Sequence, residues 1–331
     1  MIFHPTVMAL FAGSILVSFM ILYSASYAFQ ILRKWDLQSG SELQLNLERK
    51  TYLISTLLAY AFGFELLSFF LFIFTADQVH TFFVGAMCAA GSLYANDYGY
   101  LTLIAKLINF LLAGIWLVLN YVDNRGYDYP LIKAKYFLLL LLVPLILLEA
   151  FLQANYFLRL NPNIITSCCG TLFSTETLIL PSELGFLSGI ETSAVFYLVL
   201  LLTVGTGFLF ILKGKGAYLF SGASAVAFAV SVVAIFSFVS CYIYELPTHH
   251  CPFCILQKEY GYIGYLIYVT LLGGAIAGLS VGALVPFRKI ISLSEILPSF
   301  QRRLALTSST LFLVFTAIVT VRILFSGLVL D

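Results

Sequence analysis

Two cysteines that stand two residues apart, Cys251 and Cys254, directly follow His249 and His250. The short gap lets the two sulfurs meet, so the pair can cycle between dithiol and disulfide or form a permanent structural disulfide. The start of a helix and a nearby cation such as Lys258 would stabilise the thiolate, which is the form that attacks a disulfide. Thiolate and imidazole groups are also ligands for zinc and copper. The segment therefore predicts either thiol–disulfide redox chemistry or a metal site made by His249, His250, Cys251 and Cys254.

The adjacent pair Cys168 and Cys169 is a second candidate for thiol chemistry. A disulfide between neighbouring residues is strained and easily reduced, which suits exchange with a substrate thiol or with the first pair. Two adjacent thiolates also suit the capture of a soft ion such as mercury or Cu(I). The remaining cysteines, Cys88 and Cys241, are single. Each of them can pair across loops, ligate a metal or pack as a small apolar side chain.

The elements that position these residues are apolar helices. Of 331 residues, 61% are hydrophobic and only 10% are charged, whereas a soluble domain is about 25% charged. Apolar runs of about 20 residues are typical of transmembrane helices. The sequence therefore predicts an all-α integral membrane protein surrounded by the lipid bilayer, and no basic run suggests that it binds nucleic acid. We expect eight helices, at about residues 7–32, 51–75, 101–121, 135–157, 191–212, 217–240, 260–284 and 305–327.

The basic residues indicate how these helices are oriented. Most of the 17 Lys and Arg residues fall in alternate connections, and connections on the cytoplasmic side are the ones enriched in Lys and Arg. This pattern predicts a multi-pass protein of the cell membrane with both termini outside. The residues in alternate connections are Arg33, Lys34, Arg49, Lys50, Arg125, Lys133, Lys135, Lys213, Lys215, Arg288, Lys289, Arg302 and Arg303.

In this orientation all six cysteines and all four histidines lie at the extracytoplasmic face. We expect two four-helix halves, residues 1–157 and 191–331, which share similar segments before their third helices, Asp97–Tyr100 and Glu259–Tyr262. Function should lie on the extracytoplasmic connections, because they are the long ones. They are residues 76–100, which can dip back into the bilayer as a re-entrant loop, residues 158–190, which carry the adjacent cysteines, and residues 241–259.

Ionisable residues inside the predicted spans are further candidates, because charge in lipid is costly. Glu65 lies near the middle of its span, while Lys106 and Glu149 lie at similar depth in two neighbouring spans. The latter two can form a structural ion pair, and all three can belong to a proton relay. A stripe of small residues in the span 260–284 predicts close packing against another helix. The stripe consists of Gly274, Gly278 and Gly282.

The segment Cys251-x-x-Cys254-x-x-Gln257-Lys258 resembles the CxxCxxQR segment of the DsbB-type disulfide-bond oxidases. The vitamin K epoxide reductase family is a more distant comparison. Lys258 replaces the arginine of the DsbB-type pattern, and both families have four transmembrane helices rather than eight. The resemblance implies that Cys251 and Cys254 exchange electrons with a membrane quinone, that Gln257 and Lys258 bind this quinone, and that Lys258 polarises its ring.

These patterns favour an integral membrane thiol–disulfide redox protein that acts at the extracytoplasmic face and exchanges electrons with a membrane quinone. Its partner would be an extracytoplasmic thiol protein or redox complex. One alternative is a protein that transports or delivers a soft metal ion such as copper, mercury or zinc. Another is a non-catalytic membrane subunit or assembly factor of an extracytoplasmic redox complex. The residues that carry the redox interpretation are Cys251, Cys254, Cys168 and Cys169.

Overall fold

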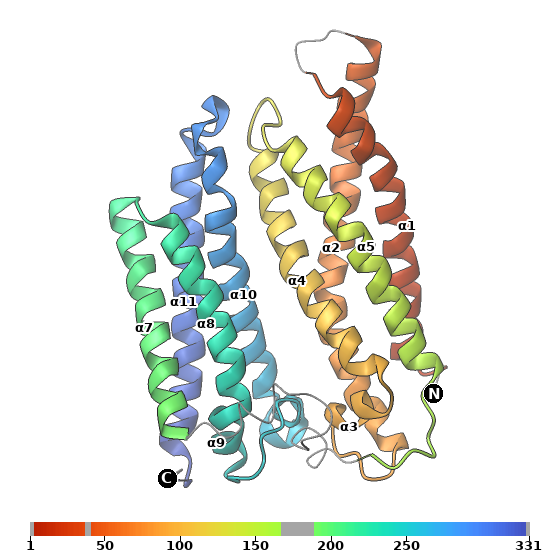
Figure 1. Cartoon of the computed structure of the whole chain (residues 1–331), viewed down its shortest axis with the longest axis vertical. Helices are drawn as coiled ribbons and strands as arrows, with labels where there is room; N and C mark the ends of the chain where they lie inside the picture. Colours follow the sequence, from red (N-terminus) through yellow and green to blue (C-terminus); the bar gives the residue numbers. More distant parts are fainter. Residues whose placement is uncertain (1–2, 37–40, 167–188, 329–331) are drawn as a thin grey trace. The chain divides into compact units, whose positions relative to one another are not determined.

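The computed structural model describes residues 3–36, 41–166 and 189–328, and this part of the chain is helical. Within it, eight helices are long and apolar enough to cross a membrane, which confirms the predicted number of spans. Six are α1 (Pro5–Lys34), α2 (Glu42–Val79), α4 (Tyr98–Asp123), α5 (Ile132–Leu158), α7 (Gly189–Lys213) and α11 (Ile296–Phe325) (Figure 1). The other two are α10 (Ile263–Ala283) and α8 (Ala217–Ala234), which continues through the π-helical turn η2 (Ile235–Val239) into α9 (Ser240–Tyr244).

The outward faces of these helices are apolar, as a lipid environment requires. On α7, for example, Leu198, Leu201 and Phe208 are each more than half exposed. In the hydrocarbon no water is present to satisfy backbone N–H and C=O groups, so a spanning segment must bond them within itself. A helix does so, and the helical folding of each long apolar run is therefore compatible with a membrane.

The chain folds as two compact units. The first contains α1, most of α2, α4 and α5, and the second contains α7 to α11 together with a segment from between the second and third spans. The first unit comprises Met1–Thr75, Ala95–Asn161 and Pro286–Leu297. The second unit comprises Ala76–Tyr94, Pro162–Val285 and Pro298–Asp331.

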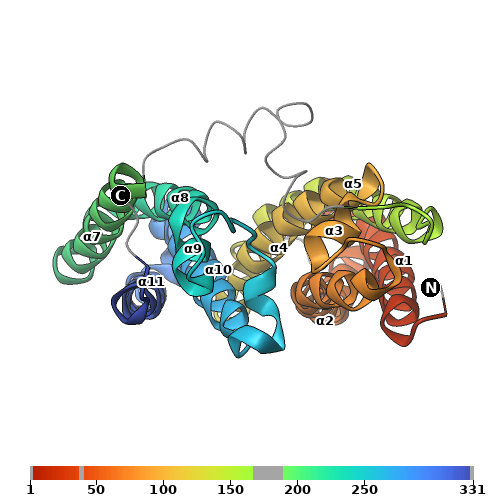
Figure 2. The same cartoon turned by 90° about the horizontal axis from the view of Figure 1, so that it is seen from below.

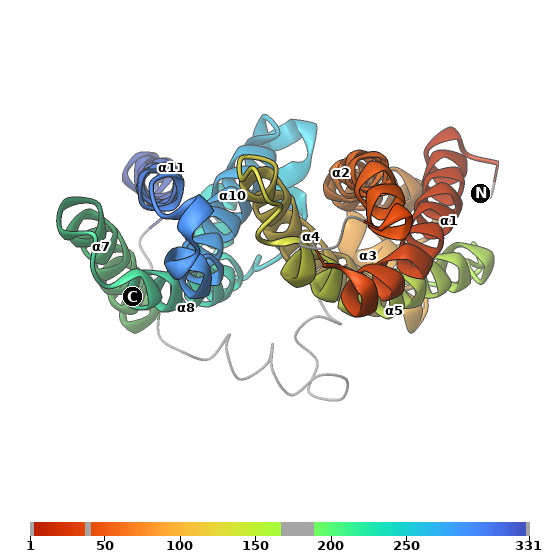
Figure 3. The ribbon, with the colours of Figure 1, turned by 90° about the horizontal axis from the view of Figure 1, so that it is seen from above.

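In the first unit, the core lies between α1, α2, α4 and α5, which Figure 3 shows end on. Phe62 and Trp116 are fully buried there, with ring centroids 4.8 Å apart. The Trp116 indole N–H donates to the Lys135 carbonyl oxygen over 2.9 Å, so the ring fills the core without an unsatisfied polar group. Leu139 and Leu142 of α5 complete this layer.

In the second unit, α10 packs against α8 and α11 through its glycine stripe, which confirms the predicted packing role. A Cβ added at Gly278 would lie 2.3 Å from the Ser224 hydroxyl of α8, and one at Gly274 would meet the Phe312 ring of α11. The Ser308 hydroxyl of α11 donates to the Gly274 carbonyl oxygen over 2.7 Å. Small residues let these helices approach closely enough for such bonds.

Residues 76–94 lead from the end of α2 through the 3-10 turn η1 (His80–Phe82) to the short helix α3 (Ala89–Tyr94). Between η1 and α3, Gly85 has a φ of +87°, a conformation that favours glycine. Val84 forms an isolated β-bridge with Ile165 of the same unit. This segment carries Cys88 and belongs to the second unit, although it precedes α4 in the chain.

The helix after the cysteine pair begins later than predicted. The sequence suggested a start near residue 260, but α10 starts at Ile263, because Gly261 and Tyr262 have φ values of +65° and +57°. Two 3-10 turns, η3 (Cys254–Leu256) and η4 (Lys258–Tyr260), precede it. The cysteine pair is therefore held by a compact loop next to α9 and α10, seen from below in Figure 2, and not by the first turn of a helix.

Candidate thiol centre

Three cysteine thiols converge in the second unit, and we call them the thiol centre. The Sγ atoms of Cys88, Cys251 and Cys254 all lie within 4.8 Å of one another, and those of Cys88 and Cys251 are 3.4 Å apart. All three are free thiols, with side chains 0%, 1% and 5% exposed in that order. The sequence did not predict that Cys88 lies beside Cys251 and Cys254. The one feature that pointed to it was that Cys88 was expected on the same face of the membrane as that pair.

Two tyrosine hydroxyls hold the loop that carries the cysteine pair. Tyr244, the last residue of α9, donates to the carbonyl oxygen of Cys251 over 2.5 Å, and Tyr268 of α10 donates to that of Pro252 over 2.7 Å. A Cβ added at Gly264 would lie 2.8 Å from a backbone oxygen of the loop, so α10 can approach it this closely only with glycine there. The two helices thus fix the loop backbone.

The side chain of Gln257 connects this loop to the segment that carries Cys88. Its Nε2 donates to Asp77 Oδ1 over 3.0 Å and to the Met87 carbonyl oxygen over 2.9 Å. The same Asp77 oxygen accepts the backbone N–H of Ala89, so both neighbours of Cys88 in the chain take part in the network. Gln257 was predicted to bind a cofactor by resemblance, and in the structure its amide bonds position Cys88.

The local hydrogen bonds make the cysteine pair chemically unequal. Hydrogen bonds from the Cys254 and Cys88 thiols lower the pKa of Cys251 well below its usual value, and backbone N–H groups of Phe253 and Cys254 add to this effect against the opposing effect of burial. As the donor, Cys254 has a raised pKa. The predicted helix N-terminus does not supply the stabilisation, because α10 starts at residue 263. The Lys258 side chain is exposed.

A cysteine–histidine contact anchors the other end of the loop. His250 Nδ1 lies 3.2 Å from Cys241 Sγ and 3.0 Å and 3.1 Å from the carbonyl oxygens of Ser237 and Phe236 in η2. Because carbonyl oxygens only accept, we assign a proton to Nδ1. A π-helical turn disturbs the regular backbone bonds of a helix, and His250 donates to carbonyls within it. The histidine therefore ties the loop to the end of α8.

Among the described residues, one group of side chains lies close enough together to hold a metal ion. It consists of the three cysteines of the thiol centre. His249 and His250 do not belong to this group. His249 instead packs against Tyr244, with ring centroids 4.3 Å apart, and burial lowers its pKa. Cys168 and Cys169 lie outside the described residues.

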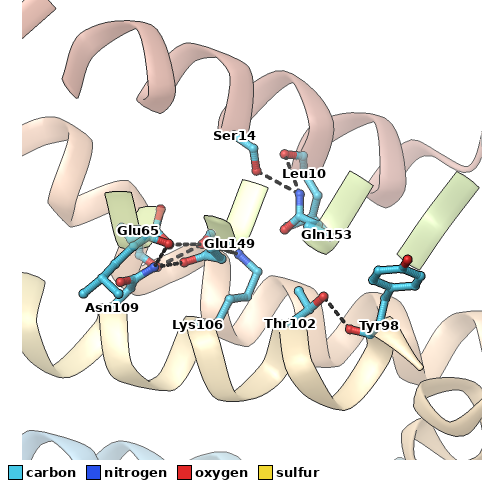
Figure 4. Close-up of polar contacts among 11 residues, drawn as sticks. Leu10, Ser14, Glu65, Tyr98, Thr102, Lys106, Asn109, Glu149 and Gln153 are labelled. Carbon is cyan, nitrogen blue, oxygen red and sulfur yellow. Dashed lines mark hydrogen bonds and ion pairs between the residues drawn. The ribbon is translucent and has the colours of Figure 1, made fainter. Parts of the chain in front are cut away.

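The first unit brings together the ionisable residues predicted inside the spans (Figure 4). Lys106 Nζ and Glu149 Oε1 are 2.6 Å apart, so the expected ion pair is present. Asn109 donates to the other Glu149 oxygen over 2.6 Å, and Ser68 accepts a hydrogen bond from Lys106 over 3.1 Å. The Ser68 hydroxyl in turn donates to Glu65 Oε1 over 3.5 Å, which makes one connected group of two carboxyls and one ammonium.

A second buried ion pair was missed, because Lys135 was assigned to a connection by its charge. Lys135 lies in α5 with no exposed side-chain surface, and its Nζ is 2.5 Å from Asp123 Oδ2. Asn120 and Ser55 accept further hydrogen bonds from the same ammonium. Asp123 also accepts the backbone N–H of Leu131, so the pair closes the connection between α4 and α5.

Comparison with protein-family models, with curated proteins and with solved structures finds no match to this chain. The fold and the site alone define its class, a helical protein with eight helices long and apolar enough to cross a membrane, among the described residues, and a buried three-thiol centre.

Proposed function

We propose that this chain is a membrane thiol–disulfide oxidoreductase that transfers electrons between an extracytoplasmic protein thiol and a membrane quinone. The observation that carries the proposal is the 3.4 Å separation of the Cys88 and Cys251 sulfurs beside Cys254. Disulfide exchange requires direct attack of one sulfur on another. Three neighbouring thiols satisfy that requirement without any large movement.

The chemistry begins with the reduced pair. Cys251 and Cys254 lose two electrons and two protons to the quinone, which becomes quinol, and a disulfide forms between them. Cys88 then attacks the Cys251 sulfur, so that the Cys88–Cys251 bond forms and the Cys251–Cys254 bond breaks. The proton that Cys88 gives up goes to Cys254, whose pKa is raised. The disulfide thereby moves to Cys88.

Cys88 is the cysteine from which the disulfide can leave the protein. It follows Met87, which is 69% exposed, in a short turn where Val84 is also 67% exposed. A substrate thiolate attacks Cys88, releases the Cys251 thiolate, and forms a mixed disulfide that a second substrate thiol resolves. A thiol of low pKa is a good leaving group, and the pKa of Cys251 is lowered. The substrate leaves oxidised, and the three thiols are reduced again.

Binding of a soft metal ion is a second candidate, because three thiolates within 4.8 Å of one another suit Cu(I) or zinc. Three thiolates around one Cu(I) ion carry a net negative charge at a site whose three side chains are no more than 5% exposed, and burying that charge is costly. A disulfide beside a thiol is neutral, so this environment favours the redox function.

The test is the redox state of each cysteine in the purified protein, reduced and then exposed to a short-chain quinone in lipid nanodiscs. Maleimide labelling after denaturation, followed by peptide mapping, should show that the quinone protects two of the three thiols. Cys251→Ser and Cys254→Ser should both abolish this oxidation, whereas Cys241→Ser, a buried cysteine outside the thiol centre, should not. If all three thiols stay reduced and the protein instead takes one Cu(I) per chain from a competing chelator, the metal function replaces the redox function.

A further inference from the structure

The group around Glu65 in the first unit contains two buried carboxyl groups but only one buried ammonium. Glu65, Glu149 and Lys106 are 4%, 2% and 1% exposed. The ammonium of Lys106 is paired with Glu149 at 2.6 Å. With both carboxyls ionised the group would carry one net negative charge inside an apolar helix bundle, where such a charge is costly.

Glu65 is connected to the ion pair through Ser68. The Ser68 hydroxyl accepts a hydrogen bond from Lys106 Nζ over 3.1 Å and donates one to Glu65 Oε1 over 3.5 Å. Because one ammonium balances only one of the two buried carboxyl groups, the other must carry a proton. Lys106 and Glu149 are the ionisable groups that face Glu65 from α4 and α5, and α1 has no ionisable residue before Tyr23.

We infer that Glu65 and Glu149 share one exchangeable proton, so that the first unit holds a proton-binding site inside the membrane. The bound proton makes the group neutral together with Lys106. This inference concerns the first unit alone and is independent of the thiol chemistry proposed for the second. The ligand is a proton, and the residue that holds it when Glu149 pairs with Lys106 is Glu65.

Polar side chains continue from this site in one direction. Gln153 lies one helical turn after Glu149 and is 1% exposed, and its Nε2 donates to the Ser14 hydroxyl over 2.8 Å (Figure 4). Its Oε1 is buried and has no hydrogen-bond partner among the described residues, so a buried acceptor is available for a proton-carrying group. On α4, Thr102 lies one turn before Lys106.

Gln153 and Thr102 lie toward the end of the unit at which α4 begins and α5 ends. In the opposite direction an apolar layer lies between this group and the buried Lys135–Asp123 pair. The side chains of this layer include Phe62, Trp116, Leu142 and Ile146, each no more than 3% exposed. The proton therefore exchanges through the end that carries Gln153.

Infrared spectroscopy of the purified full-length protein tests the site directly, because the carbonyl stretch of a protonated carboxyl group is distinct from that of a carboxylate and shifts in D2O. Wild-type protein should show one buried protonated carboxyl. Glu65→Gln should remove this band, since Glu149 then pairs with Lys106 and needs no proton. Lys106→Met should increase the band about twofold, because both carboxyls must then be neutral. The control Glu42→Gln, an exposed glutamate on the same helix, should leave the band unchanged.

Two results would overturn the inference. A wild-type spectrum without a protonated-carboxyl band that Glu65→Gln removes would show that the pair does not hold a proton. A band that never shifts in D2O would show that the proton is locked in place. Glu65→Gln keeps the Lys106–Glu149 pair and the shape of the side chain, so this variant is expected to fold.

The exchange route has its own test. Gln153→Leu keeps both carboxyls and Lys106, so the band should keep its area. Its shift in D2O should slow by about tenfold, the factor that corresponds to losing ~1.4 kcal/mol of stabilisation along the route. An unchanged exchange rate in Gln153→Leu would overturn the route through this end of the unit.

Discussion

Replacing Gln257 with leucine should release the segment that carries Cys88 without altering any cysteine. The leucine keeps much of the side-chain volume but removes two hydrogen bonds, one to the Asp77 carboxylate at 3.0 Å and one to the Met87 carbonyl at 2.9 Å. A hydrogen bond to a charged group contributes about 1.5–3 kcal/mol and a neutral one about 0.5–1.5 kcal/mol. Because Gln257 is partly exposed, we take the lower end, a loss of about 2 kcal/mol.

This loss should appear as faster labelling of Cys88. Its side chain is fully buried, so a maleimide reaches it only when the segment opens. When opening and closing are fast, the labelling rate follows the open population. A change of about 2 kcal/mol raises that population about 30-fold, since 1.4 kcal/mol is a factor of ten. The assay is the maleimide labelling rate of Cys88, followed by peptide mass spectrometry on the reduced protein in nanodiscs.

A matched control and a second variant sharpen this test. Gln153→Leu is the same substitution in the first unit, and it should leave the labelling rate of Cys88 unchanged. Gln257→Glu would place a carboxylate against Asp77 and should accelerate labelling further, because like charges at this distance repel. If Gln257→Leu changes the rate by less than about threefold, or ~0.6 kcal/mol, Gln257 does not hold Cys88 in place and the reasoning is wrong.

Three further outcomes are expected. Gly278→Val should destabilise the protein by about 1–3 kcal/mol in thermal unfolding, because the added Cβ would overlap a serine hydroxyl of α8. The control is Gly222→Ala, whose Cβ would meet nothing within 4 Å. Lys135→Met should destabilise by about 3–5 kcal/mol by leaving Asp123 charged and buried, and adding Asp123→Asn should recover most of this loss. Burial lowers the pKa of His249 in the folded state, so the unfolded chain binds a proton more readily there and stability should fall as the pH drops below about 6.5. In His249→Gln this part of the pH dependence of Tm should disappear.

The spans could be predicted because they follow from local composition. A run of about 20 apolar residues can satisfy its backbone in lipid only as a helix, whatever its neighbours are. The pairing of Lys106 with Glu149 was also predictable, since two opposite charges at similar depth in neighbouring spans each need a partner. Lys135 was wrongly assigned to a connection, because its charge was the only guide to its position. Charge alone assigns a lysine to a connection, and only the fold shows that Asp123 balances it inside the unit.

The thiol centre could be predicted only in part. The spacing of Cys251 and Cys254 brings those two sulfurs together through local geometry. Cys88 joins them because residues 76–94 pack with the second unit, a long-range arrangement that no spacing in the sequence encodes. The same holds for Gln257. The resemblance implied that Gln257 binds a quinone, which stays a prediction, and no motif predicted its hydrogen bonds to Asp77 and Met87.

The presence of a third thiol changes what the cysteine pair can do. A dithiol that becomes a disulfide has no nucleophile left and must wait for an external thiol to reach it. Three adjacent thiols hold at most one disulfide, so one sulfur always remains available to attack it. In the second unit that third sulfur, Cys88, lies next to the exposed Met87, while Cys251 and Cys254 are fixed by two tyrosines. A rigid pair and a third buried thiol, whose chain neighbour Met87 is exposed, together allow a disulfide formed in the pair to reach a protein substrate. This separation of tasks makes Cys88→Ser the most informative cysteine variant. It should leave oxidation of the pair by quinone intact and block transfer of the disulfide to substrate thiols.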